Sequence, residues 1–321
     1  MNLSLLHTPD GVRDFYGIEL DYKNYIMNRF EENIKLYGYD EIQTPTLEFL
    51  NVFLEETNYS YESKTFRFID RDGETLVLRP DYTPSVARCA VKYFSDENYP
   101  LRFFYKGNAF SNKGLYEGKA IEVTQMGIEL LKDDTYLADA EVLTIVIKNL
   151  IAIGLEDFKI CVNTKEEDTS RLNKVISLLN DYGYSKYITY DPDIDSNFMY
   201  YTGMVFKVYT YGVGDSICKG GRYNSLLEKY GEGVPAVGCV FMIDNILQSL
   251  KKQKIEMKKA CHSKIYLIYD DENENDAIKK AEEYRKQDRI CVLVKNTDYD
   301  DTFKDFCASN DYKVEIFKEN S

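Results

Sequence analysis

The sequence predicts an α+β protein in which helices flank a mostly antiparallel sheet and a small α/β unit follows. Two observations support this fold class. Over about the first 250 residues, alternating apolar runs follow one another with short turn signals between them, as antiparallel hairpins require. After residues 255–262 the composition changes, and short strand and helix patterns alternate to the end. A length of 321 residues also suggests two domains, which we place at 1–255 and 262–321.

Each element of this fold has its own local signal. Apolar side chains recur at helical spacing over 18–37, which predicts an amphipathic helix. Segment 37–50 predicts one strand, and its Pro45 suits an edge or an interface. In 65–81 (TFRFIDRDGETLVLRPD), two alternating runs flank a turn and predict a hairpin. Similar patterns predict helices at 84–94, 135–153 and 167–182, strands at 101–110, 120–131 and 157–163, two strands joined at 212–215 with a glycine turn into a helix, and a strand entering a helix over 235–250. In the second domain they predict strands at 264–269, 289–295 and 312–317, and helices at 275–287 and 300–309.

The hairpin predicted over 101–131 has the frame of half a nucleotide-binding site. Its loop offers Ser111, Asn112, Lys113 and Gly114 where phosphates would lie, and no arginine. Arginine is the side chain that supplies bidentate, permanently charged donors to phosphate. The hairpin therefore keeps the frame of such a site without its main anion-binding groups.

The composition argues against several classes of protein. A net charge of −14 is unlike a nucleic-acid-binding protein, so no nucleic-acid partner is expected. Seven scattered cysteines without a C-x-x-C pair, and only two histidines, predict no metal site and a reduced, cytoplasmic setting. The first 14 residues lack a signal-peptide pattern, and the longest apolar stretch, 142–155, is interrupted by Lys148 and Asn149. We therefore expect no membrane association, and we expect no cofactor.

Six segments, in order, are similar to the catalytic domain of the histidyl-tRNA synthetase family over about 250 residues. They are TPDGVRDFYG, TPTLEF, LRPDYTPSVAR, YYTGMVF, KGGRYNSLL and PAVG. Taken alone, each is a weak signal; the glycine pair before Arg-Tyr, for example, is usually a turn. Their shared order is specific, and the resemblance implies a class II aminoacyl-tRNA synthetase-like antiparallel sheet.

The chain departs from this family where synthetases bind ATP. The resemblance places an arginine that grips the α-phosphate at Ser111, a glutamate that contacts adenine at Lys113 and an arginine on ATP at Asn245. It also places the histidine-specific arginine, which pairs with the ligand carboxylate, at Ser196. Adenylate formation needs positive charge where negative charge develops on phosphate, and serine and asparagine do not provide it. We therefore expect no catalytic residues and no synthetase activity.

The amino-acid pocket of the family is better retained. The resemblance implies that Asp81, Thr83 and Gln125 hold the ammonium group of histidine, that Glu129 and Tyr201 bind its imidazole, and that Tyr200 forms a wall. A carboxylate suits an ammonium ion, and an acceptor with a hydroxyl suits the two ring nitrogens. Each residue also has a structural alternative: a helix cap at Thr83, a solvent-facing strand at Gln125 and Glu129, and core aromatics at Tyr200 and Tyr201.

Two further departures concern tRNA. Between Asn163 and Tyr200 there is room for little more than one helix and one strand, where synthetases carry an insertion domain. The second domain is shorter than an anticodon-binding domain, and from His262 onward it holds 10 lysines and arginines against 15 acidic residues. An acidic, truncated domain is a poor tRNA ligand.

These features together resemble the regulatory subunits of ATP phosphoribosyltransferase, the synthetase-like paralogues of histidine biosynthesis. The resemblance implies a homodimer core within a hetero-oligomer, a short-form catalytic subunit as partner, an activating role, and L-histidine as feedback effector. Two alternatives stay open: a divergent histidyl-tRNA synthetase, and a synthetase-like binding protein without a metabolic partner.

Overall fold

A computed structural model describes residues 6–54, 65–112, 120–194, 200–231, 233–256, 264–310 and 312–317. The chain divides into two compact units, Met1–Met257 and Lys258–Ser321. Among the described residues, no helix is both long and apolar enough to cross a bilayer. Each unit is described by itself below.

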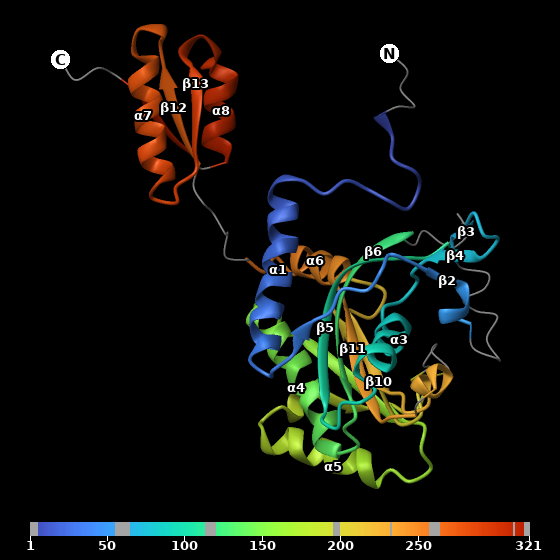
Figure 1. Ribbon diagram of the computed structural model, residues 1–321. Coiled ribbons are helices and arrows are strands. Elements are labelled where there is room, and N and C mark those ends of the chain that lie inside the picture. Colours follow the sequence, from blue (N-terminus) through green and yellow to red (C-terminus); the bar gives the residue numbers. More distant parts are fainter. Residues whose placement is uncertain are drawn as a thin grey trace. The chain divides into compact units, whose positions relative to one another are not determined.

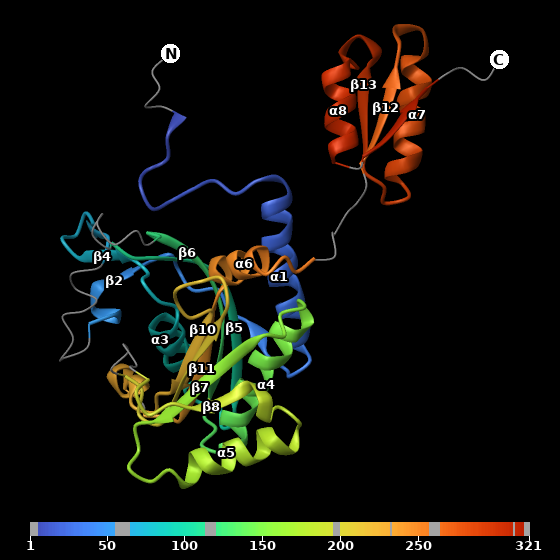
Figure 2. The same cartoon turned by 180° about the vertical axis from the view of Figure 1, so that it is seen from behind.

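The first unit is built on a mixed sheet, which has eight strands within the described residues (Figures 1 and 2). Its order is β1-β5-β6-β11-β10-β9-β7-β8, and the inner strands from β5 to β7 pair antiparallel. Each edge strand joins in parallel, β1 to β5 and β8 to β7. The strands are β1 (Asp40–Glu41), β5 (Leu101–Phe110), β6 (Glu122–Leu131), β7 (Phe158–Thr164), β8 (Ile188–Tyr190), β9 (Met204–Thr210), β10 (Cys218–Arg222) and β11 (Ala236–Met242). The predicted α+β class is confirmed, with parallel pairs at the two edges.

Helices cover both faces of this sheet. Figures 1 and 2 show α1 and α4 on one side of the sheet and α3 on the other. The main core lies under the first pair, where the rings of Phe30 and Phe241 are 4.8 Å apart. The predicted helices are confirmed as α1 (Gly17–Lys35), α3 (Thr83–Phe94), α4 (Tyr136–Ala152), α5 (Ser170–Asp181) and α6 (Ile243–Lys252). Between Asn163 and Tyr200, the described residues hold α5, a 3-10 turn η4 (Ser185–Tyr187) and β8, much as the spacing predicted.

The prediction of one strand over 37–50 is wrong. The chain instead leaves the main sheet after β1 and enters a second, three-stranded sheet of described residues as β2 (Leu47–Phe49). Arg79 explains the break: its Nη1 donates to the backbone oxygens of Thr44 at 2.9 Å and Pro45 at 3.2 Å, which removes them from strand pairing. Strand β2 pairs with the predicted hairpin, which is confirmed as β3 (Arg67–Ile69) and β4 (Thr75–Leu78). The short 3-10 turn η2 (Leu50–Val52) follows β2.

The glycine turn predicted before a helix is also wrong. Gly220 and Gly221 lie inside β10. Glycine is needed at both positions because a side chain on either would overlap backbone oxygens of the neighbouring strands. The segment that follows is a 3-10 turn, η5 (Leu226–Tyr230), rather than an α-helix. Strand pairing through both glycines keeps the next residue, Arg222, in register with Val237 of β11.

The second unit is a parallel sheet between two helices, as predicted. Strand β12 (Ile265–Tyr269) lies between β13 (Cys291–Lys295) and β14 (Lys313–Ile316). Ile265 and Leu267 pack toward α7 (Glu274–Arg285), and Tyr266 and Ile268 pack toward α8 (Asp301–Ser309). This alternation is the two-residue period of a strand that is buried on both faces. Short 3-10 turns, η6 (Asp271–Asn273) and η7 (Asn296–Asp298), precede the helices.

Candidate functional site

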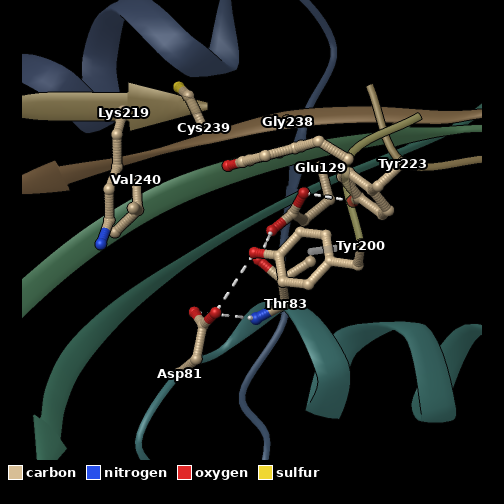
Figure 3. Close-up of a pocket in the computed structure, with 10 residues that line it drawn as sticks. Asp81, Thr83, Glu129, Tyr200, Lys219, Tyr223, Gly238, Cys239 and Val240 are labelled. Carbon is tan, nitrogen blue, oxygen red and sulfur yellow. Dashed lines mark hydrogen bonds between the residues drawn. The ribbon is translucent and has the colours of Figure 1, made fainter. Parts of the chain in front are cut away.

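A small pocket lies over the centre of the main sheet, on the face that α3 covers (Figure 3). It encloses about 240 Å³ of space counted out to its mouth. Helix α3 and the residues before it, strands β6, β10 and β11, and the segment before β9 all contribute side chains. The lining residues are Asp81, Thr83, Glu129, Tyr200, Tyr201, Lys219, Tyr223, Gly238, Cys239 and Val240.

Glu129 is the most buried polar group of this pocket. Only 1% of it is exposed, and its carboxylate accepts hydrogen bonds from the hydroxyls of Thr83 (2.7 Å) and Tyr223. A Cβ on the facing residue, Gly238, would overlap this carboxylate, so glycine is required there. Burial raises the pKa of Glu129 to about 8, against the opposing effect of the hydroxyl donors, and the nearby Asp81 raises it further. The site thus holds an acid that titrates near neutral pH.

Asp81 supplies a second carboxylate at the start of α3. Its Oδ1 accepts from the backbone N–H of Tyr82 at 2.7 Å, and its Oδ2 accepts from the hydroxyl of Tyr200 at 3.3 Å. The positive end of the helix dipole favours a negative charge at this place. Figure 3 shows the carboxylate of Asp81 on the pocket side of the sheet, below Thr83 and Tyr200. Two carboxylates therefore line one small pocket.

The structure brings together five of the six residues that the sequence suggested. Asp81, Thr83, Glu129, Tyr200 and Tyr201 all line the pocket. Gln125 does not line the pocket. It lies on β6, the strand that carries Glu129, opposite Gly107 and Met242. Its buried Oε1 has no hydrogen-bond partner among the described residues.

The structural alternatives for these residues can now be compared with the structure. Thr83 donates its hydroxyl to Glu129 and does not cap α3. Gln125 and Glu129 are 5% and 1% exposed, so they do not form a solvent-facing strand. Tyr200 does pack as a core aromatic, 4.9 Å from the ring of Tyr201 and 5.8 Å from that of Tyr223. Its hydroxyl nevertheless reaches the pocket carboxylate of Asp81.

Sequence reasoning missed two polar residues of the pocket, Lys219 and Tyr223. Both belong to KGGRYN, which was interpreted as a turn. Had the segment been recognised as a strand, its two-residue period would have placed Lys219, Gly221 and Tyr223 on one face. The strand alternation was therefore the available signal.

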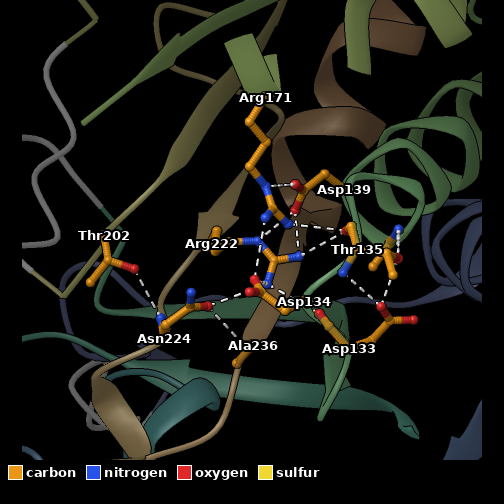
Figure 4. Close-up of polar contacts among 10 residues, drawn as sticks. Asp133, Asp134, Thr135, Asp139, Arg171, Thr202, Arg222, Asn224 and Ala236 are labelled. Carbon is orange, nitrogen blue, oxygen red and sulfur yellow. Dashed lines mark hydrogen bonds and ion pairs between the residues drawn. The ribbon is translucent and has the colours of Figure 1, made fainter. Parts of the chain in front are cut away.

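Arg222, between Gly221 and Tyr223, points to the face of the main sheet opposite the pocket and joins a buried ionic network (Figure 4). Arg222 is fully buried, and its Nε donates to Oδ1 of Asp139 at 2.8 Å. The other oxygen of Asp139 accepts from Nε of Arg171 at 2.7 Å. Arg222 also donates to Oδ1 of Asn224 at 3.2 Å. This network ties β10, α4 and α5 together and fixes the backbone that carries Tyr223.

The four positions at which the sequence predicted lost synthetase residues have other contacts where they are described. The Nδ2 of Asn245 donates to the backbone oxygen of Ser216 at 2.9 Å. Its neighbour Asp244 pairs with the buried Lys23 at 2.9 Å and accepts from the N–H of Thr124 at 2.8 Å. The backbone N–H of Ser111 donates to the oxygen of Ile121 at 2.8 Å. Lys113 and Ser196 lie outside the described residues.

No group of three or more histidine, cysteine, aspartate or glutamate side chains suited to a metal ion exists in the described parts of the chain. The pocket offers two carboxylates, hydroxyl groups and one ammonium group. Such a set suits binding of a small zwitterion with a nitrogen heterocycle.

The fold and the pocket define a histidyl-tRNA synthetase-like protein, and a family profile described as histidyl-tRNA synthetase matches residues 11–166 and 162–246. The crystal structure of an ATP phosphoribosyltransferase regulatory subunit/histidyl-tRNA synthetase from Bacillus halodurans superimposes with a TM-score of 0.83 at 25% identity, over 98% of this chain and 99% of that one. The histidyl-tRNA synthetase of S. aureus has the same fold, with a TM-score of 0.81 at 24% identity, over 97% of this chain and 90% of its own.

Sequence relatives narrow the class. An ATP phosphoribosyltransferase regulatory subunit of Acetivibrio thermocellus is 31% identical across 88% of this chain and 85% of its own length. One from Clostridium novyi is 29% identical across 93% and 89%. The chain belongs to the family of ATP phosphoribosyltransferase regulatory subunits, which act in histidine biosynthesis.

Proposed function

We propose that this chain is a non-catalytic subunit that activates a short-form ATP phosphoribosyltransferase catalytic subunit and transmits feedback inhibition by L-histidine. The observation that carries the proposal is the pocket, in which two carboxylates and three tyrosines line one small hollow over the main sheet. A fold that recognises an amino acid becomes a sensor when binding favours one conformation of a complex over another, with coupling of about 1–3 kcal/mol.

Histidine matches the chemistry of this pocket. Its ammonium group pairs with Asp81, which lies just before the N-terminus of α3, and its imidazole N–H donates to Glu129. Thr83 and Tyr223 hold the Glu129 carboxylate in one orientation by donating to its two oxygens. Tyr201 lines the pocket and completes the set of hydroxyl groups near the ring, while Tyr200 forms the wall.

The proposed lack of adenylate-forming activity rests on the missing positive charge at the predicted phosphate site. In-line attack on a phosphate requires fixed positive groups, and one such arginine is worth about 10³–10⁵ in rate. The positions matched to these arginines hold Ser111, Ser196 and Asn245. Asn245 and its neighbour Asp244 are engaged in contacts that hold α6 against the sheet and α1. We therefore propose no adenylate formation, no cofactor and no catalytic residue.

The partners proposed are a catalytic subunit, a second copy of this chain as the homodimer core of a hetero-oligomer, and L-histidine, in a cytoplasmic setting. Nucleic acid is not among them, because the chain carries a net charge of −14. Residues 262–321 are proposed to be a truncated counterpart of an anticodon-binding domain, with residues 1–255 as the synthetase-like domain. From His262 onward this unit holds 10 lysines and arginines against 15 acidic residues, a balance that disfavours tRNA binding.

The test is phosphoribosyl transfer from phosphoribosyl pyrophosphate to ATP by a short-form catalytic subunit from the same source, with and without this chain. We expect the rate to rise severalfold on mixing and to fall again when L-histidine is added. Activation without a response to histidine would support the catalytic subunit as partner and contradict the proposal that the pocket binds histidine as an effector. No activation at any ratio, together with histidine-dependent pyrophosphate–ATP exchange, would favour a divergent synthetase instead.

A further inference from the structure

Two lysines stand side by side on the pocket face of the main sheet. Lys219 of β10 is directly opposite Lys207 of β9 in the antiparallel register. Residues that oppose one another in this way share a face of the sheet, with Cβ atoms about 4.5–5.5 Å apart. Both side chains are half-buried, whereas their neighbours Phe206, Val208 and Cys218 point into the core on the other face. The register therefore places two ammonium-bearing side chains on the pocket side of the sheet.

The pocket itself is polarised. Its acidic groups, Asp81 and Glu129, come from the start of α3 and from β6. Lys219 comes from β10, two strands away from β6, and is the cationic side chain among the described lining residues. Figure 3 shows Lys219 and Val240 extending from neighbouring strands toward the side of the sheet on which Asp81 lies. A ligand with separated positive and negative groups fits this arrangement better than an amine alone.

We propose that Lys219, with Lys207 beside it, binds the carboxylate of the amino-acid ligand and makes the pocket select a zwitterion over the matching amine. The inference rests on the proposed histidine pocket and names the residue that recognises the second charge of the ligand. A lysine suits this role because its flexible stem lets a point charge follow a carboxylate without a fixed fork geometry. The neighbouring Lys207 strengthens the local field and attracts the anion without direct contact.

The experiment compares two probes that differ in one group. L-histidine has the carboxylate, and L-histidinol has a hydroxymethyl group in its place. Isothermal titration of the full chain with each probe gives the carboxylate preference directly. For the unmodified protein we expect L-histidine to bind about 10- to 100-fold more tightly, the range of a charge-assisted hydrogen bond.

Three variants assign that preference. In Lys219→Met the preference falls to less than about 3-fold while L-histidinol affinity stays within about 3-fold, because only the carboxylate contact is lost. Lys219→Arg keeps most of the preference, since the charge remains. Lys207→Met reduces it by a smaller factor. Thermal unfolding of each variant, followed by circular dichroism, confirms that the fold is intact.

The outcomes separate this inference from the proposed function. A full preference retained by Lys219→Met would overturn the role of Lys219. Equal affinity of the unmodified protein for both probes would also overturn it while leaving an imidazole-binding pocket. Binding of neither probe would remove the histidine pocket, and the lysine role with it.

Discussion

Two buried carboxylates in the first unit, Glu129 and Asp139, have opposite surroundings. Asp139 is fully buried between two guanidinium groups, with its oxygens 2.7 Å from Nε of Arg171 and 2.8 Å from Nε of Arg222. Glu129 is 1% exposed, and its carboxylate accepts hydrogen bonds from the hydroxyls of Thr83 and Tyr223. Among the described residues no cation lies within ion-pair distance of Glu129.

Asp139 therefore serves the fold, whereas Glu129 has the surroundings expected of the proposed binding acid. A buried charge that serves the fold is compensated by fixed opposite charges, because an unpaired charge in the interior is costly. Glu129 avoids that cost by a raised pKa, so that much of the ligand-free population is protonated at neutral pH. An incoming cationic or hydrogen-bonding ligand then supplies the compensation. A buried acid without a fixed opposite charge suits a site that binds a ligand, whereas a protein core has no use for one.

Arg222 and Tyr223 show how closely the two environments are coupled. They are adjacent in sequence, and the strand period sends one to each side of the sheet. Arg222 holds the backbone against α4 through Asp139, while Tyr223 donates to Glu129. The ionic network therefore positions one wall of the pocket, although Arg222 and Asp139 are not among its lining residues.

The largest expected effect is on the compensated acid. Asp139→Asn removes the negative charge and leaves Arg222 buried, which lowers the free energy of unfolding by about 3–5 kcal/mol. Asp134→Asn is the matched control, because Asp134 pairs with the same two arginines but its side chain is 62% exposed. That control costs less than about 1 kcal/mol. Urea unfolding at neutral pH measures both, and equal losses would contradict the structural role of Asp139.

The next effect concerns the space that the binding acid occupies. Gly238→Ala places a methyl group on the Glu129 carboxylate and close to the backbone oxygen of Ile128, and it costs about 1–3 kcal/mol. Gly214→Ala is the control, since a Cβ at Gly214 meets nothing within 4 Å. Histidine affinity should fall with Gly238→Ala and stay unchanged with Gly214→Ala. An alanine at 238 that leaves stability and affinity unchanged would show that the carboxylate moves freely.

Sequence patterns predicted the long helices and strands. They failed where contacts with residues distant in the sequence determine the course of the backbone. Helices α1 and α4 and the β5–β6 hairpin carry their periodicity locally, and their bounds were predicted to within a few residues. The course of segment 37–50 depends on Arg79, which binds the carbonyl groups of Thr44 and Pro45 from 35 and 34 residues further along the chain. No local pattern contains that information.

The site was predictable to a similar extent. The family resemblance supplied Asp81, Thr83 and Glu129, which the structure brings together. It did not supply Lys219 or Tyr223, because two glycines favour a turn when the sequence is considered alone. Only the pairing of β10 with β9 and β11 shows that those glycines make room for neighbouring strands. Gln125 was included by resemblance and lies outside the pocket lining.

The third prediction concerns pH. The folded pKa of Glu129 is about 8, above its ordinary value of 4.5, so the folded state binds an extra proton between these values. Stability from this group is therefore complete below the unfolded pKa and is lost as pH rises through about 8. The difference in unfolding free energy between the unmodified protein and Glu129→Gln should fall by up to about 1.4 kcal/mol for each pH unit in that window. A flat or rising difference would mean that Glu129 is ionised in the ligand-free fold.

The smallest effect concerns one hydroxyl. The hydrogen bond from Tyr223 lowers the pKa of Glu129, so Tyr223→Phe raises that pKa further and costs about 1 kcal/mol of stability. Tyr230→Phe is a matched control, because its hydroxyl donates to the backbone oxygen of Val52 at 2.9 Å. Both variants should lose similar stability, but only Tyr223→Phe should move the pH dependence set by Glu129 to higher pH, as measured against the same chain with Glu129→Gln. A shift to lower pH, or an equal shift in both variants, would show that hydroxyl donation does not stabilise the ionised acid, and the contrast between Glu129 and Asp139 would then rest on the two arginines of Asp139 alone.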